Sequence, residues 1–151
     1  MTQSSVRVLV RRLAHYDDDW ELPRYATAGS AAVDLRNAGG TVVLEPLERR
    51  LIPTGLAIAL PAGVEAQIRP RSGLALRRGI GIVNTPCTID SDYRGEIQIP
   101  LINYDRAPQE VAHGERIAQL LVARVLAIDW AETDALPESG RGAGGFGSTG
   151  S

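Results

Sequence analysis

The chain has 151 residues, enough for one domain with a hydrophobic core. Its 16 basic and 18 acidic residues give a formal net charge of −2 and are mixed along the sequence, so they predict neither a nucleic-acid partner nor a membrane surface. Lysine is absent from the sequence, which excludes Schiff-base chemistry and the lysine of a Walker-type phosphate loop.

Cysteine and histidine are too scarce for a disulfide framework or a metal cage. Cys87 is the single cysteine, and His15 and His113 have no recognisable ligand spacing, so we expect both histidines in loops or on the surface. The first residues lack an apolar signal segment, and no hydrophobic run approaches the ~20 residues of a membrane span. We therefore expect a cytoplasmic protein.

Alternation of apolar and polar residues predicts half-buried strands over residues 6–10, 64–69 and 96–101. Turn signals at residues 38–40, 53–55, 61–63 and 84–86 give a rhythm that favours a sandwich, jelly roll or barrel over βαβ units. A turn or two of helix is expected over residues 72–78, where Ser72 suits a cap and Gly79 a stop. We predict an all-β fold.

The strand-like pattern ends near residue 136. We assign residues 1–136 to a β-barrel core and residues 137–151 to a flexible, glycine-rich arm, which could close over a bound ligand. The arm contains the only phenylalanine, Phe146, whose ring has no core to join there. Arg141 and the hydroxyls of Ser148 and Thr149 would suit a phosphate, although a disordered terminus has the same composition.

Two internal segments combine groups that bind anions or activate water. Residues 70–74 place Arg71, Ser72 and backbone N–H groups at the start of the expected helix, which suits an anion but also describes an ordinary cap. Residues 88–95 place two carboxylates and a tyrosine in a turn. One carboxylate there could act as a general base, worth roughly 10²–10⁴ in rate, although a polar surface turn would look the same.

Two further polar residues lie in apolar strand-like segments. Gln119 needs hydrogen-bond partners if it is buried, and a bond to the backbone would satisfy it. Asp34 would require an arginine or a hydrated cation.

Five segments, in this order, resemble the five motifs of the trimeric deoxyuridine triphosphatases (dUTPases). They are Asp34 with its surroundings, residues 71–75, residues 89–95, residues 114–120 and residues 141–150. The resemblance runs from about residue 28 to the end. It implies a jelly-roll or distorted β-barrel and a homotrimer with active sites shared between subunits. The implied reaction is hydrolysis of dUTP to dUMP and pyrophosphate, which keeps uracil out of DNA and supplies dUMP for thymidylate synthesis.

The resemblance also implies roles for residues around the base and sugar. Asp90 would deprotonate the water that attacks the α-phosphorus and hold the 3′-hydroxyl, and Tyr93 would pack against the deoxyribose. Backbone groups of the hairpin from Asn84 through Thr88 and Ile89 to Asp90, with Gln98 on the returning strand, would contact uracil through a donor and acceptor pattern that cytosine mismatches.

Phosphate contacts are implied in the same way. The residues that would hold the phosphate chain are Arg71, Ser72, Gly73 and Gln119. Those that would meet its γ end, once Phe146 stacks on uracil, are Arg141, Gly147, Ser148 and Thr149. Mg²⁺ is expected mainly on triphosphate oxygens and water, with Asp34 at most a water-mediated neighbour.

One position departs from the family pattern, because Cys87 stands where glycine is usual, two residues before Ile89. Strained geometry there could cost on the order of 1 kcal/mol or more, or the position tolerates a small side chain. The alternatives are a dCTP deaminase of the same fold and a non-catalytic nucleotide-binding or scaffold protein. The deaminase usually carries a His-Arg-Ile-Asp-Pro-Gly type segment and needs a glutamate base, whereas Asp90 is followed here by Ser-Asp-Tyr.

Overall fold

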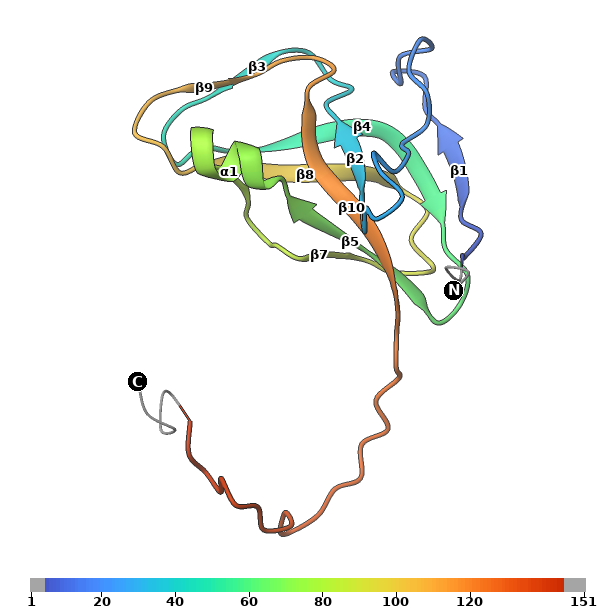
Figure 1. The fold of residues 1–151 in the computed structure, drawn as a ribbon, viewed down its shortest axis with the longest axis vertical. Coiled ribbons are helices and arrows are strands. Elements are labelled where there is room, and N and C mark those ends of the chain that lie inside the picture. The colour runs from blue at the N-terminus through green and yellow to red at the C-terminus, as the bar shows by residue number, and fades with distance from the viewer. Residues whose placement is uncertain (1–4, 146–151) are drawn as a thin grey trace.

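A computed structural model describes residues 5–145, and over this range the chain is built from strands and one short helix (Figure 1). The elements are β1 (Leu9–Arg12), β2 (Val33–Arg36), β3 (Val42–Leu44), β4 (Arg49–Ala59), β5 (Val64–Pro70), α1 (Ser72–Arg78), β6 (Ile80–Ile82), β7 (Cys87–Ile89), β8 (Glu96–Asn103), β9 (Gln109–Val111) and β10 (Arg116–Arg124). The all-β prediction is confirmed.

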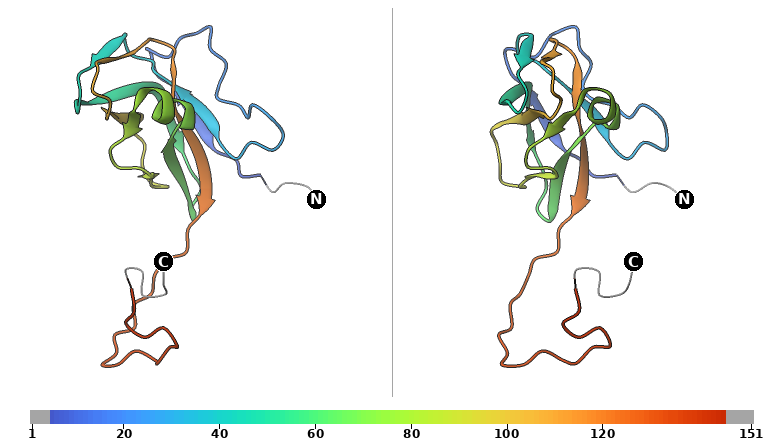
Figure 2. Two further views of the ribbon diagram at one scale, coloured as in Figure 1. Left: turned by 60° about the vertical axis from the view of Figure 1, so that its left-hand side comes forward. Right: turned by 90° about the vertical axis from the view of Figure 1, so that its left-hand side faces the viewer.

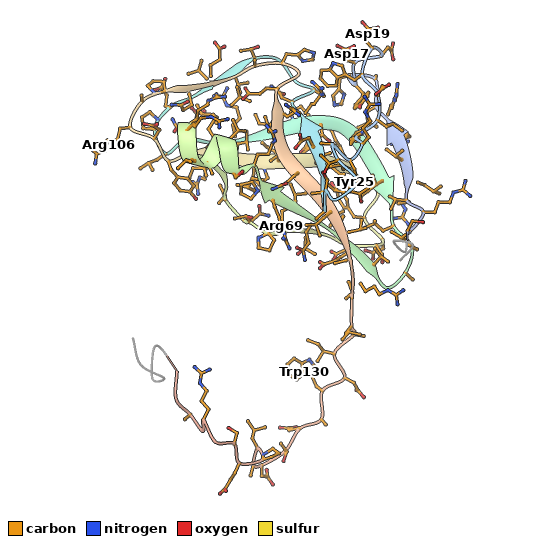
Figure 3. All side chains as sticks on the ribbon, viewed as in Figure 1. Asp17, Asp19, Tyr25, Arg69, Arg106 and Trp130 are labelled. Atoms are coloured by element: carbon orange, nitrogen blue, oxygen red, sulfur yellow. The ribbon has the colours of Figure 1, made fainter. Side chains whose placement is uncertain are left out.

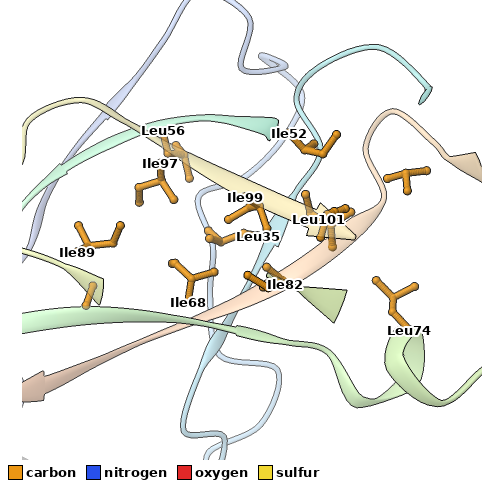
Figure 4. Close-up of a cluster of buried hydrophobic side chains, with 14 of the residues drawn as sticks. Leu35, Ile52, Leu56, Ile68, Leu74, Ile82, Ile89, Ile97, Ile99 and Leu101 are labelled. Carbon is orange, nitrogen blue, oxygen red and sulfur yellow. The ribbon is translucent and has the colours of Figure 1, made fainter. Parts of the chain in front are cut away.

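Two four-stranded antiparallel sheets enclose the core. Their strand orders are β1-β4-β8-β6 and β2-β10-β5-β7, and β3 pairs with β9 in a separate ribbon. Figure 4 shows the side chains of both sheets meeting, with Ile97, Ile99 and Leu101 of β8 near Ile68 of β5. The period-two alternation predicted for residues 64–69 and 96–101 is confirmed, because alternate residues of β5 and β8 are buried.

The strand predicted near residue 10 forms, but it is not half-buried. All four residues of β1 are exposed, and Val8, just before the strand, is the residue of this stretch that packs against the core. β1 is the edge strand of its sheet and pairs with β4 alone. Alternation of valines predicted an inward face, but both faces of β1 are exposed in this chain.

The turn predicted at residues 53–55 is wrong, because these residues lie inside β4. The register of β4 against β8 shifts between Pro53 and Ala57, which marks a β-bulge. Gly55 has φ +69 at this bulge, a conformation that glycine adopts without a Cβ penalty. Thr54 is buried and donates its hydroxyl to the carbonyl oxygen of Ile97 at 2.6 Å. The glycine and proline of this segment therefore bend a long strand rather than end it.

The helix spans the predicted range, Ser72–Arg78, and stops at Gly79, whose φ of 60 is left-handed. The predicted capping by Ser72 is wrong. The N-cap is Arg71, which leaves β5 with extended backbone angles, and no side chain caps the first turn. Ser72 is the first helical residue.

The chain leaves the barrel after β10. Residues 125–145 contain no helix or strand, and they extend away from the sheets in every view of Figures 1 and 2. Trp130 in this segment is 86% exposed (Figure 3). His15 and His113 are exposed and lie between strands, as predicted. Across residues 5–145, no helix has the length and apolar character needed to cross a membrane.

Candidate active site

Asp34 binds two arginines at the point where β2, β10 and β5 lie side by side. The Arg71 Nε donates to Asp34 Oδ1 at 2.9 Å, and the Arg116 Nη1 donates to Oδ2 at 3.1 Å. Arg71 also donates through Nη1 to the carbonyl oxygen of Arg116, at 3.1 Å. Of the two partners expected for Asp34, an arginine or a hydrated cation, the structure shows arginine. We call these three residues the arginine–aspartate cluster.

Gln119 lies next to this cluster, because it pairs with Asp34 on one side of β10 and with Arg69 on the other. Its Nε2 donates to the carbonyl oxygen of Pro70 at 2.8 Å, which is the backbone bond that would satisfy it. The side chains of Asp34, Arg69 and Gln119 line a surface hollow of about 450 Å³ (Arg69 is labelled in Figure 3). Guanidinium groups match the geometry of phosphate oxygens, so the hollow suits a phosphate chain.

The first turn of α1 adjoins the same cluster through Arg71. The first N–H groups of any helix have no intrahelical acceptor, and here the first intrahelical bond runs from the Ala75 N–H to the Arg71 carbonyl at 3.0 Å. Ser72 is exposed at this end. The Arg77 guanidinium folds back over Gly73. It lies so close that a Cβ built on Gly73 would be 2.7 Å from Arg77 Nη2. Backbone donors and a further cation therefore lie beside the cluster.

The turn between β7 and β8 holds Asp90 and Tyr93, as predicted. Asp90 is exposed, and its carbonyl accepts from the Tyr93 N–H at 3.1 Å. The Tyr93 hydroxyl donates to the carbonyl oxygen of Glu96 at 2.9 Å. A Cβ on Gly95 would lie 2.3 Å from the same hydroxyl oxygen, so only glycine lets the ring lie across the turn.

The other residues predicted to contact the base flank this turn. Asn84, Thr88 and Gln98 are exposed, whereas Ile89 is buried in the core. The Gln98 Nε2 lies 3.3 Å from the Glu96 Oε2. Ile89 can therefore contact a base only through its backbone.

A single chain does not bring Asp90 to the arginine–aspartate cluster. On β5, Ile89 pairs with Ala66, and Arg71 follows Ala66 by five residues. At the rise of a strand, that offset places Ile89 about 17 Å from Arg71 along the strand, and Asp90, one residue further away, about 20 Å from it. The residues predicted from sequence fall into two groups at different ends of β5.

Cys87 adopts ordinary strand geometry. It pairs with Ile68 on β5 and packs partly against the core. Leu47 is the one non-glycine residue with positive φ in the described part of the chain, so Cys87 does not occupy a backbone conformation that needs glycine. The backbone is therefore not strained by the departure from the family pattern.

Sequence reasoning assigned no role to three residues that the structure places at these sites, namely Arg77, Glu96 and Arg116. Arg116 lies in one of the quoted motifs, but its bond to Asp34 spans 82 positions. Sequence spacing gave no signal for this bond, because it depends on the register of β10 against β2, which shifts just after Arg116. The position of Arg77 over Gly73 could have been found from the spacing of four residues within a helix.

The described residues do not form a protein cage for a metal ion. Over residues 5–145 there is no group of three or more histidine, cysteine or acidic side chains that could hold one. Both Asp34 oxygens accept from guanidinium groups. Mg²⁺ often binds one or two carboxylates together with substrate phosphates and water, so these residues fit an ion that is held mainly by the substrate.

Four of the predicted site residues, Phe146, Gly147, Ser148 and Thr149, lie outside the described residues. Arg141 lies within them, and its Nε donates to the carbonyl oxygen of Gly144 at 2.7 Å.

Comparison with known proteins identified close relatives across almost the whole chain. The family model described as dUTPase matches residues 18–150. A deoxyuridine 5′-triphosphate nucleotidohydrolase from Anaeromyxobacter sp. (strain Fw109-5) is 54% identical over 96% of this chain and 98% of its own. One from Wolbachia pipientis wMel is 51% identical over 99% of each chain.

Solved structures show the same fold. The dUTPase of Staphylococcus bacteriophage 80alpha with dUPNHPP has a TM-score of 0.85 at 25% identity, over 96% of this chain and 99% of its own. A mutant dUTPase from phage phi11 of S. aureus, whose structure shows the coordination of a structural Mg(II) ion, has a TM-score of 0.76 at 21% identity, over 87% and 99%. The predicted jelly-roll fold is confirmed.

Proposed function

This chain belongs to the dUTPase family, and from that membership we infer that it hydrolyses dUTP to dUMP and pyrophosphate. It is a dUTP diphosphatase. The observation that carries this conclusion is 54% identity, over 96% of the chain, to a relative named for this reaction. The relatives reported above do not favour a dCTP deaminase or a scaffold protein.

The arginine–aspartate cluster and the start of α1 bind the triphosphate. Arg71, the Ser72 hydroxyl and the Gly73 N–H meet its oxygens, and Gln119 adds an amide from β10. Asp34 keeps Arg71 and Arg116 in place, because each of its oxygens accepts a charge-assisted hydrogen bond from one of them. Phosphoryl transfer depends mainly on positioning and charge neutralisation, and this cluster supplies both.

Asp90 is the general base of the reaction. Its exposure supports this role, because a base must be open to the water that it deprotonates. The water attacks the α-phosphorus in line, and pyrophosphate leaves. Tyr93, fixed by its bond to the Glu96 carbonyl, packs against the deoxyribose where a ribose 2′-hydroxyl would collide. The uracil contacts come from the hairpin of residues 84–90 and from Gln98.

The active site is shared between subunits of a homotrimer. The separation of about 20 Å between Asp90 and Arg71 along one chain supports this proposal, because a base must lie within about 3 Å of its proton. A second copy that brings its Asp90 to the Arg71 of the first would complete the site. Each trimer would then hold three equivalent sites.

Mg²⁺ assists by neutralising charge on the triphosphate. Asp34 contacts Arg71, and it would meet the ion through water, since both its oxygens accept from arginines. Removal of free Mg²⁺ with EDTA should lower pyrophosphate release, and re-addition should restore it.

We keep the sequence-based division into a core of residues 1–136 and an arm of residues 137–151 as a proposal, together with a cytoplasmic location. The arm closes over the site, with Phe146 on uracil and Gly147, Ser148, Thr149 and Arg141 at the γ-phosphate. The extension of residues 125–145 away from the barrel supports this proposal, because that segment can reach another copy (Figure 2).

A panel of deoxy- and ribonucleoside triphosphates with Mg²⁺ tests the function. Monophosphate and pyrophosphate should form from dUTP, and far less from dCTP, dTTP and UTP. Ammonia release from dCTP would support the deaminase instead, and binding without turnover would support the scaffold protein.

A further inference from the structure

Arg78, the last residue of α1, connects the helix to β9 and to the turn that follows β9. Its Nε donates to Gln109 Oε1 at 3.1 Å, its Nη1 donates to Glu115 Oε1 at 2.5 Å, and its Nη2 donates to the carbonyl oxygen of Glu110. Each of the three guanidinium nitrogens is therefore used. The Arg78 side chain is only 28% exposed and that of Glu115 22%, so water and salt screen this ion pair less than a surface pair.

Glu115 is also bound by its own turn and by the residue that follows β2. Its Oε2 accepts from the Ala112 N–H at 3.1 Å, and its own N–H donates to the Ala112 carbonyl at 3.2 Å. Its carbonyl accepts from the N–H of Asn37 at 2.9 Å. The pair of Arg78 with Glu115 therefore joins α1 to a compact turn, and Arg116 is the next residue along the chain.

Arg116 depends on this turn for its position. The register of β10 against β2 shifts between Arg116 and Ala118, so the regular ladder of the sheet does not extend to Arg116. The Arg116 side chain is 53% exposed, and its Nη1 donates to Asp34 Oδ2 at 3.1 Å. A long side chain that is half exposed retains much of its rotamer freedom. The backbone from which it departs therefore decides where its guanidinium can lie.

The helix α1 gives the turn a fixed support. Leu74 of α1 is buried in the core. The carbonyl of Gly79, just after the helix, accepts from the N–H of Tyr104 at 2.8 Å, which ties this end of α1 to the residue after β8. Because the helix is held by both contacts, Arg78 can hold Glu115 in place rather than move with it.

We propose that Arg78 is a positioning residue for triphosphate binding: by holding Glu115 it fixes the backbone at Arg116, so that the Arg116 guanidinium meets both Asp34 and the phosphate chain. The inference rests on the proposed function, in which the arginine–aspartate cluster binds the triphosphate. It adds a residue that does not touch the substrate and that acts through Arg116.

The test measures KM and kcat for dUTP in the wild type and in Arg78→Gln. Glutamine lacks both the charge and the three donor nitrogens of arginine, so Glu115 would lose its ionic partner. The KM should rise by about fivefold or more, because Arg116 would no longer start from a fixed backbone. The kcat should change by less than about twofold, since the loss falls on binding and Asp90 is untouched.

A double-mutant cycle with Arg116 separates positioning from general support of the fold. Arg116→Ala should itself raise KM. In that background Arg78→Gln should raise KM no further, because the guanidinium that Arg78 positions is absent. A purely structural role would give the same rise in both backgrounds. Arg78→Lys keeps a charge opposite Glu115 and should recover most of the KM.

Another arginine–glutamate pair provides a matched control. The Arg50 Nη2 donates to Glu48 Oε1 at 2.5 Å, the same distance as between Arg78 and Glu115. Arg50 lies in β4, whereas Asp34 and Arg116 lie in β2 and β10 of the other four-stranded sheet. Arg50→Gln should therefore leave the KM for dUTP unchanged.

Thermal unfolding shows which variants are folded. If Arg78→Gln fails to fold, Glu115→Gln removes the same ion pair from its other side and should raise KM in the same way. An unchanged KM or a loss confined to kcat in a folded variant would overturn the inference. So would an equal rise in the Arg116→Ala background, an equal rise in Arg50→Gln, or a KM in Arg78→Lys as high as in Arg78→Gln. Failure of the wild type to hydrolyse dUTP would instead overturn the proposed function, and this inference with it.

Discussion

Two inactive variants should restore each other's activity if the active site is assembled from two subunits. One variant carries Asp90→Asn and keeps Arg71, and the other carries Arg71→Ala and keeps Asp90. Within one chain the backbone at these two positions is about 20 Å apart along β5, from the register that pairs Ile89 with Ala66. A base must lie within about 3 Å of the water it activates, so neither variant can complete a site from its own chain.

The magnitude follows from counting subunits. In trimers mixed at random from equal amounts of the two variants, each site draws its aspartate from one subunit and its arginine from another. Each of these two residues is intact with a probability of about one half, so about a quarter of the sites should be active in the unselected mixture, and about a third in trimers that contain both variants. The assay is pyrophosphate release from dUTP, after co-expression of the two variants with different tags and purification through both.

The control is the double variant, Arg71→Ala with Asp90→Asn, mixed with wild type in equal amounts. Sites shared between subunits again give about a quarter of full activity, whereas sites within one chain give about half. An inactive first mixture together with half activity in the second would refute the shared site.

Three further predictions concern single residues. Asp90→Asn should lower kcat by about 10²–10⁴ while leaving dUTP binding largely intact, and normal turnover would remove Asp90 from the role of base. Cys87→Gly should retain or improve turnover of dUTP, because the backbone at Cys87 is not strained; a loss of more than about tenfold in kcat/KM would contradict this. Gly55→Ala should lower the free energy of unfolding by about 1–3 kcal/mol, since φ is +69 and the added Cβ would lie 2.9 Å from that of Tyr16. Urea unfolding measures this loss, and Gly40→Ala, with open space around it, serves as the control that should change little.

The sequence predicted the fold correctly in the strands whose alternating apolar residues are the ones buried in the structure. The alternation in β5 and β8 predicted their buried faces because the inward residues of both strands pack into the core. The same pattern failed at β1, whose edge position is set by tertiary structure. Proline and glycine in β4 were interpreted as a turn because local sequence does not distinguish a turn from a bulge in a long strand.

The site shows a similar division. The residue types of Asp34, Arg71 and Asp90 could be recognised within their segments, and the pairing of Asp34 with an arginine was one of two expected outcomes. That Arg116 would share Asp34 depends on the register of β10 against β2, which sequence spacing does not give. The separation of Asp90 from Arg71 likewise depends on which strands flank β5.

The two tryptophans of this chain lie in contrasting surroundings. Trp20 packs between the rings of Tyr16 and His113 in the barrel, whereas Trp130 stands in water on the segment that leaves β10. The protein therefore carries two tryptophan fluorophores, one responsive to the barrel and one to the departing segment. In the Trp20→Phe variant the tryptophan emission comes from Trp130 alone. A blue shift of this emission on self-association would show that Trp130 becomes less exposed to water when it contacts another copy.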